Sequence, residues 1–217
     1  MSDIFQEVDD EVRREQLKKL WERYQSLVIA AAVLVVLGVA AWVLYDKWEA
    51  KKATEAGAAF EAAVTLADQG KHSEAEAAFA KLAAETTTTY RPLALVRAAA
   101  ELAVTDPKAA IAAYDKIAAD GSVGTELRDL AALRAGALLL DAGSIAEARA
   151  RLEPLSGADH TFRHTARELL ALGAWQSGDL AAAKRWVAMI DGDPATPADE
   201  RNRMGMLTAL IASEGKG

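Results

Sequence analysis

The feature that most constrains this chain is a run of 22 residues, Tyr24–Tyr45, without a single charged side chain. Its inner part, Leu27–Tyr45, reads LVIAAAVLVVLGVAAWVLY. At a rise of about 1.5 Å per residue, a helix of this length covers the roughly 30 Å of a bilayer's hydrocarbon core. Aromatic residues of the kind enriched at membrane interfaces stand at both ends of the run, namely Trp21, Tyr24, Trp42, Tyr45 and Trp48. The run therefore predicts a transmembrane anchor over residues 24–45, in contact with the lipid bilayer.

Two other structures place a long apolar segment near an N-terminus. A buried core helix seldom runs this far without a polar residue, and it rarely has aromatic residues at both ends. A cleaved signal peptide is the second alternative, with Val39 and Ala41 as the small residues of a cleavage site. Its apolar core usually has about 7–15 residues, however, and the acidic segment that precedes the run is long for a signal peptide. An uncleaved anchor is therefore the preferred interpretation.

Positive charges near the ends of the run predict its orientation. Five basic residues precede it and three follow it: Arg13, Arg14, Lys18, Lys19 and Arg23, then Lys47, Lys51 and Lys52. Because the side richer in Lys and Arg usually stays in the cytoplasm, residues 1–23 are predicted to be a cytoplasmic amphipathic segment. Residues 46–56 are predicted to be a helical stalk, residues 57–213 a translocated repeat domain, and residues 214–217 a tail.

The remainder of the chain favours helices. Aromatic residues make up only 6% of the 217 residues, while alanine, which loses no side-chain entropy in a helix, is abundant. This composition excludes an all-β fold. The formal net charge of −7 argues against nucleic acid as a partner, because nucleic-acid binding needs a basic surface. With no cysteine in the sequence, a disulfide framework and a thiolate metal site are both excluded.

Four segments of the chain align on a turn position, with spacings of 35, 38 and 35 residues: Gly70, Thr105, Gly143 and Gly178. Each segment has a small residue seven positions before the turn: Ala63, Ala98, Gly136 and Ala171. Each has an alanine five positions after it: Ala75, Ala110, Ala148 and Ala183. Nine and twelve positions after it come large apolar residues: Phe79, Tyr114, Leu152 and Val187, then Leu82, Ile117, Leu155 and Ile190.

This period predicts helix–turn–helix units that bury their apolar faces by stacking on one another. Asp106 and Ser144 are predicted N-caps of second helices, and an amphipathic helix over residues 198–213 is predicted to cap the array. The predicted fold is therefore all-α: one N-terminal transmembrane helix, then an α-solenoid of about four repeats and a C-terminal capping helix. The sequence leaves open whether the loop over residues 120–124 divides the array.

Over residues 57 to about 192, the pattern resembles the tetratricopeptide repeat (TPR) family, whose period is about 34 residues. The family's tryptophan near the start of the first helix is replaced by Ala59, Ala94, Ala132 and Arg167, so the units are degenerate. The resemblance implies that the protein binds other proteins, in a groove built by the first helix of each unit. By this analogy the candidate groove residues are Phe60, Val64, Leu95, Leu102, Leu133, Leu140, Leu172 and Trp175. This set is apolar and includes no cluster of Lys or Arg, which favours unfolded or extended polypeptide segments over acidic tails as ligands.

The whole layout resembles a narrower family, the bacterial ancillary subunits of the SecYEG translocon. The resemblance rests on the segment EVRREQLKKLWERYQSLVIAAAVLVVLGVAAWVLYDKW, which the Ala-rich repeats follow directly. It implies a single-pass protein of the bacterial inner membrane, with its N-terminus in the cytoplasm and its repeats in the periplasm. It also implies association with the SecYEG channel and transfer of emerging chains to periplasmic chaperones. The alternative is a cell-envelope scaffold for division, wall synthesis or secretion, without chaperone-like activity.

The sequence contains no phosphate-binding loop, nucleophile elbow or dinucleotide fingerprint. His160 and His164 have a spacing that suits a metal on one helix face, but no third ligand is evident. We expect His164 on the protein surface and His72 in a solvated turn. The sequence therefore predicts a binding protein that is not an enzyme and uses no metal or cofactor.

Overall fold

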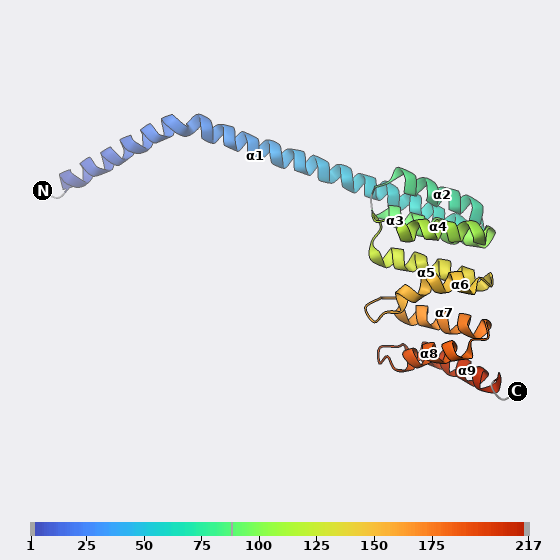
Figure 1. Cartoon of the computed structure of the whole chain (residues 1–217). Helices are drawn as coiled ribbons and strands as arrows, with labels where there is room; N and C mark the ends of the chain where they lie inside the picture. Colours follow the sequence, from blue (N-terminus) through green and yellow to red (C-terminus); the bar gives the residue numbers. More distant parts are fainter. Residues whose placement is uncertain (1–2, 88, 215–217) are drawn as a thin grey trace. The chain divides into compact units, whose positions relative to one another are not determined.

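The computed structural model of the chain describes residues 3–87 and 89–214, with side chains for residue 18 and for residues 21–87 and 89–213. Within these ranges the chain forms nine α-helices and one 3₁₀ helix, and no strand (Figure 1). The elements are α1 (Asp3–Asp68), α2 (His72–Glu85), α3 (Tyr90–Thr105), α4 (Pro107–Ala119), α5 (Thr125–Asp141), α6 (Ile145–Leu152), η1 (Glu153–Ser156), α7 (Arg163–Gln176), α8 (Leu180–Asp191) and α9 (Ala198–Glu214). The prediction of an all-α fold with a long apolar N-terminal helix is confirmed.

The chain divides into two compact units, residues 1–52 and residues 53–217. Helix α1 begins in the first unit, and its last turns belong to the second. The predicted boundaries after residues 23, 45 and 56 all fall inside this helix, where no helix end marks them, and they stay predictions. The apolar pattern predicted for residues 1–23, and the tail predicted for residues 214–217, lie mostly outside the residues whose side chains are described.

Helix pairs stack in the second unit as the repeat alignment predicts. The pairs are the last part of α1 with α2, α3 with α4, α5 with α6, and α7 with α8, and α9 follows them (Figure 1). All sixteen residues of the four aligned positions are buried. A Cβ atom added at Gly136 would lie 2.6 Å from Cγ and Cδ2 of Leu152. The small residue in the first helix is therefore what lets the second helix approach closely.

The turns between paired helices follow two designs. Gly70, Gly143 and Gly178 have φ angles of +73°, +74° and +79°, a left-handed conformation that glycine adopts without steric cost and that ends helices. In the second repeat Asp106 ends α3 instead, and its Oδ1 accepts a hydrogen bond from the Ala109 N–H at 3.0 Å. This confirms Asp106 as an N-cap.

The other predicted N-cap is confirmed in position only. Ser144 precedes α6, but its side chain makes no capping hydrogen bond. Asp179, which was not among the predicted N-caps, caps α8 by accepting a hydrogen bond from the Ala182 N–H at 2.9 Å. A serine caps a helix only when its rotamer directs the hydroxyl oxygen toward a backbone N–H of the first turn, and the sequence does not determine that rotamer.

The first helix pair is held together by aromatic side chains. The Phe60 ring lies 5.1 Å from the ring of Phe79 in an edge-on arrangement and 5.7 Å from the ring of Tyr90. Phe79 is fully buried. Gly57 permits this packing, because a Cβ atom there would lie only 3.0 Å from the Tyr90 hydroxyl. Phe60 therefore joins α1, α2 and α3 in one apolar cluster.

The array continues across residues 120–124. Val123, in this loop, is only 3% exposed and belongs to the same apolar cluster as Tyr114 of α4 and Ala131 of α5. The loop is thus part of the core that joins the second and third repeats. It does not divide the domain.

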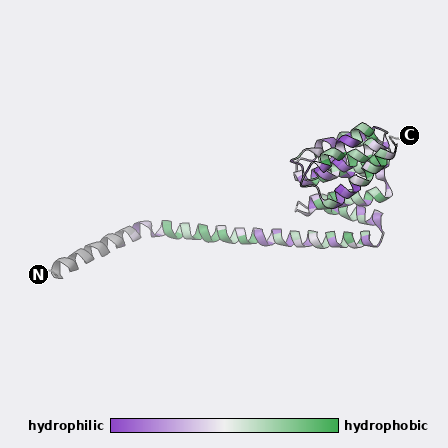
Figure 2. Ribbon diagram, turned by 90° about the horizontal axis from the view of Figure 1, so that it is seen from below, coloured by the Kyte–Doolittle hydropathy of each residue, from purple (hydrophilic) through white to green (hydrophobic). Residues whose placement is uncertain are grey.

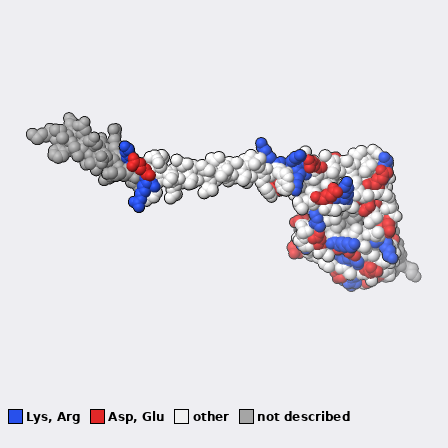
Figure 3. Space-filling view, turned by 90° about the horizontal axis from the view of Figure 1, so that it is seen from above, with Lys and Arg blue, Asp and Glu red and all other residues white. Residues whose placement is uncertain are grey.

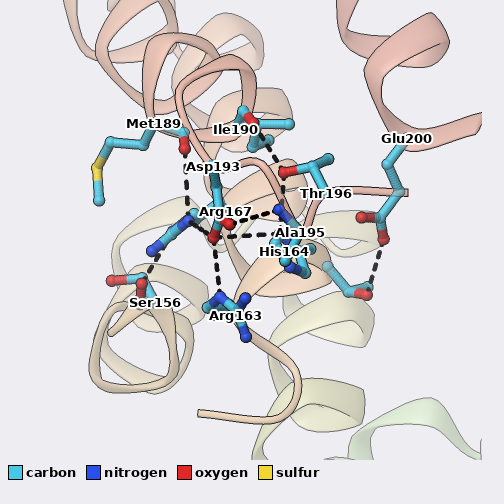
Figure 4. Close-up of polar contacts among 11 residues, drawn as sticks. Ser156, Arg163, His164, Arg167, Met189, Ile190, Asp193, Ala195, Thr196 and Glu200 are labelled. Carbon is cyan, nitrogen blue, oxygen red and sulfur yellow. Dashed lines mark hydrogen bonds and ion pairs between the residues drawn. The ribbon is translucent and has the colours of Figure 1, made fainter. Parts of the chain in front are cut away.

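The last helix pair is held by a buried ionic network (Figure 4). Asp193, after α8, accepts hydrogen bonds from Arg163 at 2.9 Å and from Arg167 at 3.1 Å. Arg167 is 5% exposed and also donates to the Ser156 carbonyl at 2.9 Å. It occupies the position where the TPR pattern has tryptophan, so a charged side chain fills this interhelix space. The Arg163 hydrogen bond, a backbone N–H and Arg167 hold the pKa of Asp193 well below its usual range.

Polar contacts also join α7 to α9. Arg203 donates two hydrogen bonds to the carboxylate of Glu168, at 2.6 and 2.8 Å. Thr165 donates to Glu200 at 3.2 Å. The side chain of His164 is only 12% exposed and its Nδ1 lies 3.1 Å from the Thr196 hydroxyl, so the expectation that His164 lies on the surface was wrong. The end of the array has a polar seam beside its apolar core.

Candidate membrane anchor and protein-binding grooves

The apolar run of α1 exposes its side chains on all sides. Leu34, Trp42 and Leu44 are 69–70% exposed, and none of the apolar 18-residue window is buried. Figure 2 shows this stretch as an almost continuous hydrophobic band along the helix, and Figure 3 shows it without charge between two charged regions. Exposed apolar surface of this extent requires a nonaqueous environment or a partner. Within the described part of the chain, α1 alone is long and apolar enough to cross a membrane, and a signal sequence would satisfy the same criteria.

The five predicted interface residues lie at both ends of this run and are between 46% and 69% exposed: Trp21, Tyr24, Trp42, Tyr45 and Trp48. Cations accompany them. The guanidinium carbon of Arg23 lies 5.9 Å from the centre of the Tyr24 ring, and Nζ of Lys52 lies 3.5 Å from the centre of the Trp48 ring. Aromatic rings next to Lys and Arg match the composition of a membrane–water interface.

The eight predicted groove residues do not form one surface. Leu133 and Leu140, each 7% exposed, belong to the core around α5, α6 and α7. Leu172 and Trp175 are half-buried against the cluster of α7, α8 and α9. The structure thus distributes this set over separate core clusters. Several residues that the analogy with TPR geometry assigned to the groove lie in the core.

The first repeat behaves in the same way. Phe60 and Val64 are half-buried against the first core cluster. Leu95 and Leu102 differ from the rest, because they line one groove together. This groove has a volume of about 390 Å³ and lies between α2, α3 and α4, and six of its thirteen lining residues are alanine.

Charged side chains from the same three helices line this groove as well. Arg91 Nη2 lies 3.3 Å from Oδ2 of Asp120. The Ser122 hydroxyl and N–H both donate to Asp120, and together with Arg91 they lower the pKa of that carboxyl. Glu76 and Lys116 complete the charged lining. The groove therefore combines an apolar wall of small side chains with two charges of each sign.

A second groove, of about 360 Å³, lies between α3 and α5. It contains Arg97 of α3, Arg134 of α5 and Tyr114 of α4. The predicted groove residues stand ten, six or three positions before each turn, and this set includes no basic cluster. Arg97 and Arg134 stand eight and nine positions before their turns, so a comparison of neighbouring positions in successive repeats would have found them.

Two of the three histidines form hydrogen bonds with carboxylates of a neighbouring repeat. Nδ1 of His72 lies 2.8 Å from Oε2 of Glu101, and Nδ1 of His160 lies 2.9 Å from Oδ2 of Asp129. The expectation that His72 is simply solvated was therefore wrong. Among the described residues, no group of three or more His, Cys, Asp or Glu side chains has a geometry that could hold a metal ion.

The comparisons with known proteins agree with the repeat architecture. Residues 18–185 match the family described as tetratricopeptide repeat-like domain. No curated protein and no solved structure gave a significant match. The matched range covers more than half of the 217 residues and includes the apolar run, the first three repeats and most of the fourth. The chain therefore belongs to the tetratricopeptide repeat-like domain family.

Proposed function

We propose that this protein is a membrane-anchored adaptor that binds other proteins through its repeat domain and catalyses no reaction. The observation that carries the proposal is the combination of an apolar helix with exposed side chains and a TPR-like array in one chain. TPR-like folds are protein-interaction folds, and their stacked helices provide extended binding surfaces. The groove between α2, α3 and α4 and the groove between α3 and α5 supply concave surfaces of the size that short peptide segments occupy.

The proposed anchor is residues 24–45, uncleaved, with the N-terminus in the cytoplasm and the repeat domain in the periplasm of a bacterium. Its support is the excess of cations before the run, five against three, and the aromatic residues at both ends. The family match begins at Lys18, ahead of the apolar run, which supports an anchor that is retained together with the repeats.

Protease accessibility tests this topology. In intact spheroplasts, added protease should degrade the repeat domain and leave residues 1–23 protected. A repeat domain that stays intact until the membrane is lysed would overturn the orientation. The presence of α1 in the mature chain, checked by mass spectrometry of the intact protein, decides between an anchor and a cleaved signal peptide.

We further propose that the partner is the SecYEG export channel, and that the repeat domain passes emerging chains to periplasmic chaperones. The support is the resemblance of residues 11–48 and the repeats that follow to the ancillary translocon subunits. The second candidate is a cell-envelope scaffold for division, wall-synthesis or secretion machinery, which the same architecture would serve without contact with unfolded chains.

Purification of the intact chain from its native membrane in mild detergent, followed by mass spectrometry of accompanying proteins, separates these candidates. A chain lacking residues 1–45 but exported to the same compartment is the control. Channel subunits and periplasmic chaperones that depend on residues 1–45 are expected. Division or wall-synthesis proteins in their place would favour the scaffold. The adaptor should also slow aggregation of an unfolded client, whereas a scaffold should not.

A further inference from the structure

Helix α9 follows the last helix pair (Figure 1) and packs on it with one face. Met204, Leu207 and Ile211 are buried in the apolar cluster of α7 and α8. On the opposite face Met206 is 64% exposed and Leu210 is 49% exposed. A helix that ends a repeat array usually has a polar outer face. Two large apolar side chains in this position therefore indicate a surface that another helix covers.

Six exposed residues of α9 recur at helical spacing and form this surface, here called the open face: Asn202, Gly205, Met206, Ala209, Leu210 and Ser213. None of the ten residues from Met204 to Ser213 is charged. The two edges of the open face differ in size. One edge has the large side chains of Met206 and Leu210, and the other edge has Gly205 and Ala209.

The small edge has the pattern of a helix pair. In each of the four repeats, a small residue of the first helix lies where the second helix approaches, as Ala171 does in α7. Ala209 stands 38 residues after Ala171, and the same spacing separates Ala98 from Gly136. Helix α7 is covered, and none of its residues before Gln176 is exposed. Ala209 occupies the same kind of position, yet it is exposed.

Gly205 has no packing neighbour within the described chain. A glycine inside a helix is less stable than alanine, because it loses more backbone entropy. Gly205 has no positive φ angle, and a Cβ atom added to it would meet no other atom within 4 Å. In α5 and α7, by contrast, a Cβ atom added at Gly136 or Gly173 would lie 2.6 or 2.7 Å from a leucine of another helix. Such glycines permit the close approach of a helix.

We propose that the open face of α9 binds the open face of a second copy of this chain, with the two α9 helices antiparallel. The middle of the open face lies between residues 207 and 208, and we place the two-fold axis there. The arrangement repeats between chains the antiparallel packing of helices that each repeat uses within the chain.

The open face is complementary to itself in this arrangement. A two-fold axis across an antiparallel pair brings each edge against the same edge of the other copy. Gly205 and Ala209 of both copies then adjoin, so the two backbones can approach closely. Met206 and Leu210 of both copies form one apolar cluster along the other edge. One contact thus covers two open faces, as in the isologous interfaces that most soluble oligomers use.

Charge favours this contact over a polar partner. The contact surface is uncharged, so it gives a charged ligand nothing to pair with. The chain as a whole has a formal net charge of −7, so two copies repel each other outside the contact. Salt screens this repulsion and leaves the apolar contact unchanged. The two helix dipoles also oppose each other in an antiparallel pair, which is favourable. Self-association should therefore strengthen with salt.

Sedimentation equilibrium of the full chain, in density-matched detergent at low and at physiological salt, tests the proposal. A contact through one helix face is smaller than a typical stable interface, so we expect dimers to predominate at about 100 µM chain and to dissociate on dilution. Dissociation should be weaker at physiological salt. A chain that stays monomeric at this concentration at both salt levels would overturn the inference.

Three variants connect the dimer to the open face. Met206→Glu introduces a charge into the contact and should weaken association at least about tenfold, because the charge loses its water. Val104→Glu, at an apolar residue of α3 that is 62% exposed, is the matched control and should dimerise like the original chain. Gly205→Leu should also weaken association at least about tenfold by blocking close approach. Undiminished dimers of Met206→Glu would show that another surface, such as α1, holds the copies together.

The stability of Gly205→Leu separates lost association from lost folding. Leucine is a better helix former than glycine, so the diluted, monomeric variant should unfold at a temperature no lower than that of the original chain. Weaker association and undiminished stability together support a contact between chains. A lower unfolding temperature would mean that Gly205 serves packing within the chain, which contradicts the inference.

Single cysteines test the direction of the helices, because the chain has no cysteine of its own. Ala209→Cys lies near the two-fold axis, and a short bismaleimide should join two copies in native membranes. Ser213→Cys is the control. In the antiparallel pair its two thiols lie about 16 Å apart along the helix axes, so crosslinking should be poor. Equal crosslinking of both variants indicates a parallel pair and overturns the proposed arrangement. A product of Ala209→Cys with a different protein, in place of a doubled chain, would assign the open face to another partner.

The outcome is separable from that of the proposed function. If channel subunits accompany the intact chain but the chain is monomeric, the adaptor stands and the dimer contact fails. If Met206→Glu abolishes dimers and no channel subunit accompanies the original chain, the dimer contact stands and the translocon assignment fails.

Discussion

The first and last helix pairs of the repeat domain use the same backbone plan with opposite interior chemistry. In the first pair, Phe60, Phe79 and Tyr90 form an aromatic cluster. In the last pair, Arg167 and Asp193 form a buried ionic network. Both pairs keep the small residue before the turn and the alanine after it, at the same alignment positions. The repeat pattern thus determines where the two helices of a pair approach each other. The side chains that fill the remaining interhelix space can differ from one repeat to the next.

This difference predicts different responses to solution conditions. Burial of aromatic surface depends little on pH or salt, because no charge changes when the side chains pack. A buried ion pair gives a net gain only while its geometry and both charges are intact. The first pair should therefore be sensitive to loss of volume, and the last pair to loss of charge.

The largest effect is expected for Phe79→Ala in the first pair. Phe79 is completely buried among neighbouring side chains. Removal of a buried aromatic ring costs about 3–5 kcal/mol of unfolding free energy, from lost transfer energy and the cavity left behind. Urea unfolding of the full chain in detergent micelles, followed by far-ultraviolet circular dichroism, measures the change.

Leu93→Ala is the matched control for Phe79→Ala. Leu93 lies on α3 next to the same pair and is 42% exposed, so its truncation should cost well under about 1 kcal/mol. If the two variants were equally stable, the aromatic cluster would not be what holds the first pair.

The next effect is expected for Arg167→Met in the last pair. Methionine keeps much of the length of the side chain, but it removes the hydrogen bonds to the Ser156 carbonyl and to Asp193. Loss of a buried charged donor that leaves its acceptors unpaired costs about 2–4 kcal/mol. Hydrogen exchange followed by mass spectrometry should show faster exchange in α8 and α9 and no change in α2. Uniform acceleration across the array would mean that the repeats do not respond separately.

A smaller effect, dependent on pH, is expected at Asp193. The hydrogen bond from Arg163 lowers the pKa of this carboxyl in the folded chain below its unfolded value. The stabilisation is therefore complete above the unfolded pKa, near about 4, and it is lost as pH falls through the folded value. Asp193→Asn should be less stable than the original chain at pH 7, and the gap should narrow as the pH is lowered below about 4. Thermal unfolding at several pH values measures both chains.

Asp191→Asn is the control for this pH series, because Asp191 is exposed two residues away and makes no ion pair with another described residue. Its stability should follow that of the original chain at every pH. A gap between Asp193→Asn and the original chain that stays constant down to pH 2 contradicts the linkage.

The sequence predicted the core of this array well because the relevant spacing is local. Positions seven before and five, nine and twelve after each turn are fixed by helix geometry within one unit, and all of them are buried. The same argument does not extend to the grooves. Which side of a helix faces a neighbouring repeat depends on the angle at which the helices pack. A small rotation of the first helix about its own axis exchanges groove positions for core positions, and Leu133 and Leu140 lie in the core.

The ionic contacts were missed for a related reason. Arg151 and Asp115 lie 36 residues apart, and Arg203 and Glu168 lie 35 apart. Separations near one repeat period bring side chains of successive units together, so a search for opposite charges at that distance would have found these pairs. Asp179 stands one position after its turn, in register with Asp106 and Ser144, so the repeat alignment could have indicated its cap. The half-buried position of His164 depends on the path of the last loop, and no periodic signal encodes it.

The smallest effect is expected for Lys81→Ala in the first pair. Lys81 and Glu85 form an ion pair one helical turn apart at 4.0 Å, with side chains that are 73% and 64% exposed. Such a pair contributes at most about 0.5 kcal/mol, because water and salt screen it and two long side chains must be ordered. The urea midpoint of Lys81→Ala should match that of the original chain at low and at high salt. A midpoint shift as large as that of Arg167→Met would mean that charge, too, holds the first pair, and the contrast between the two ends of the array would fail.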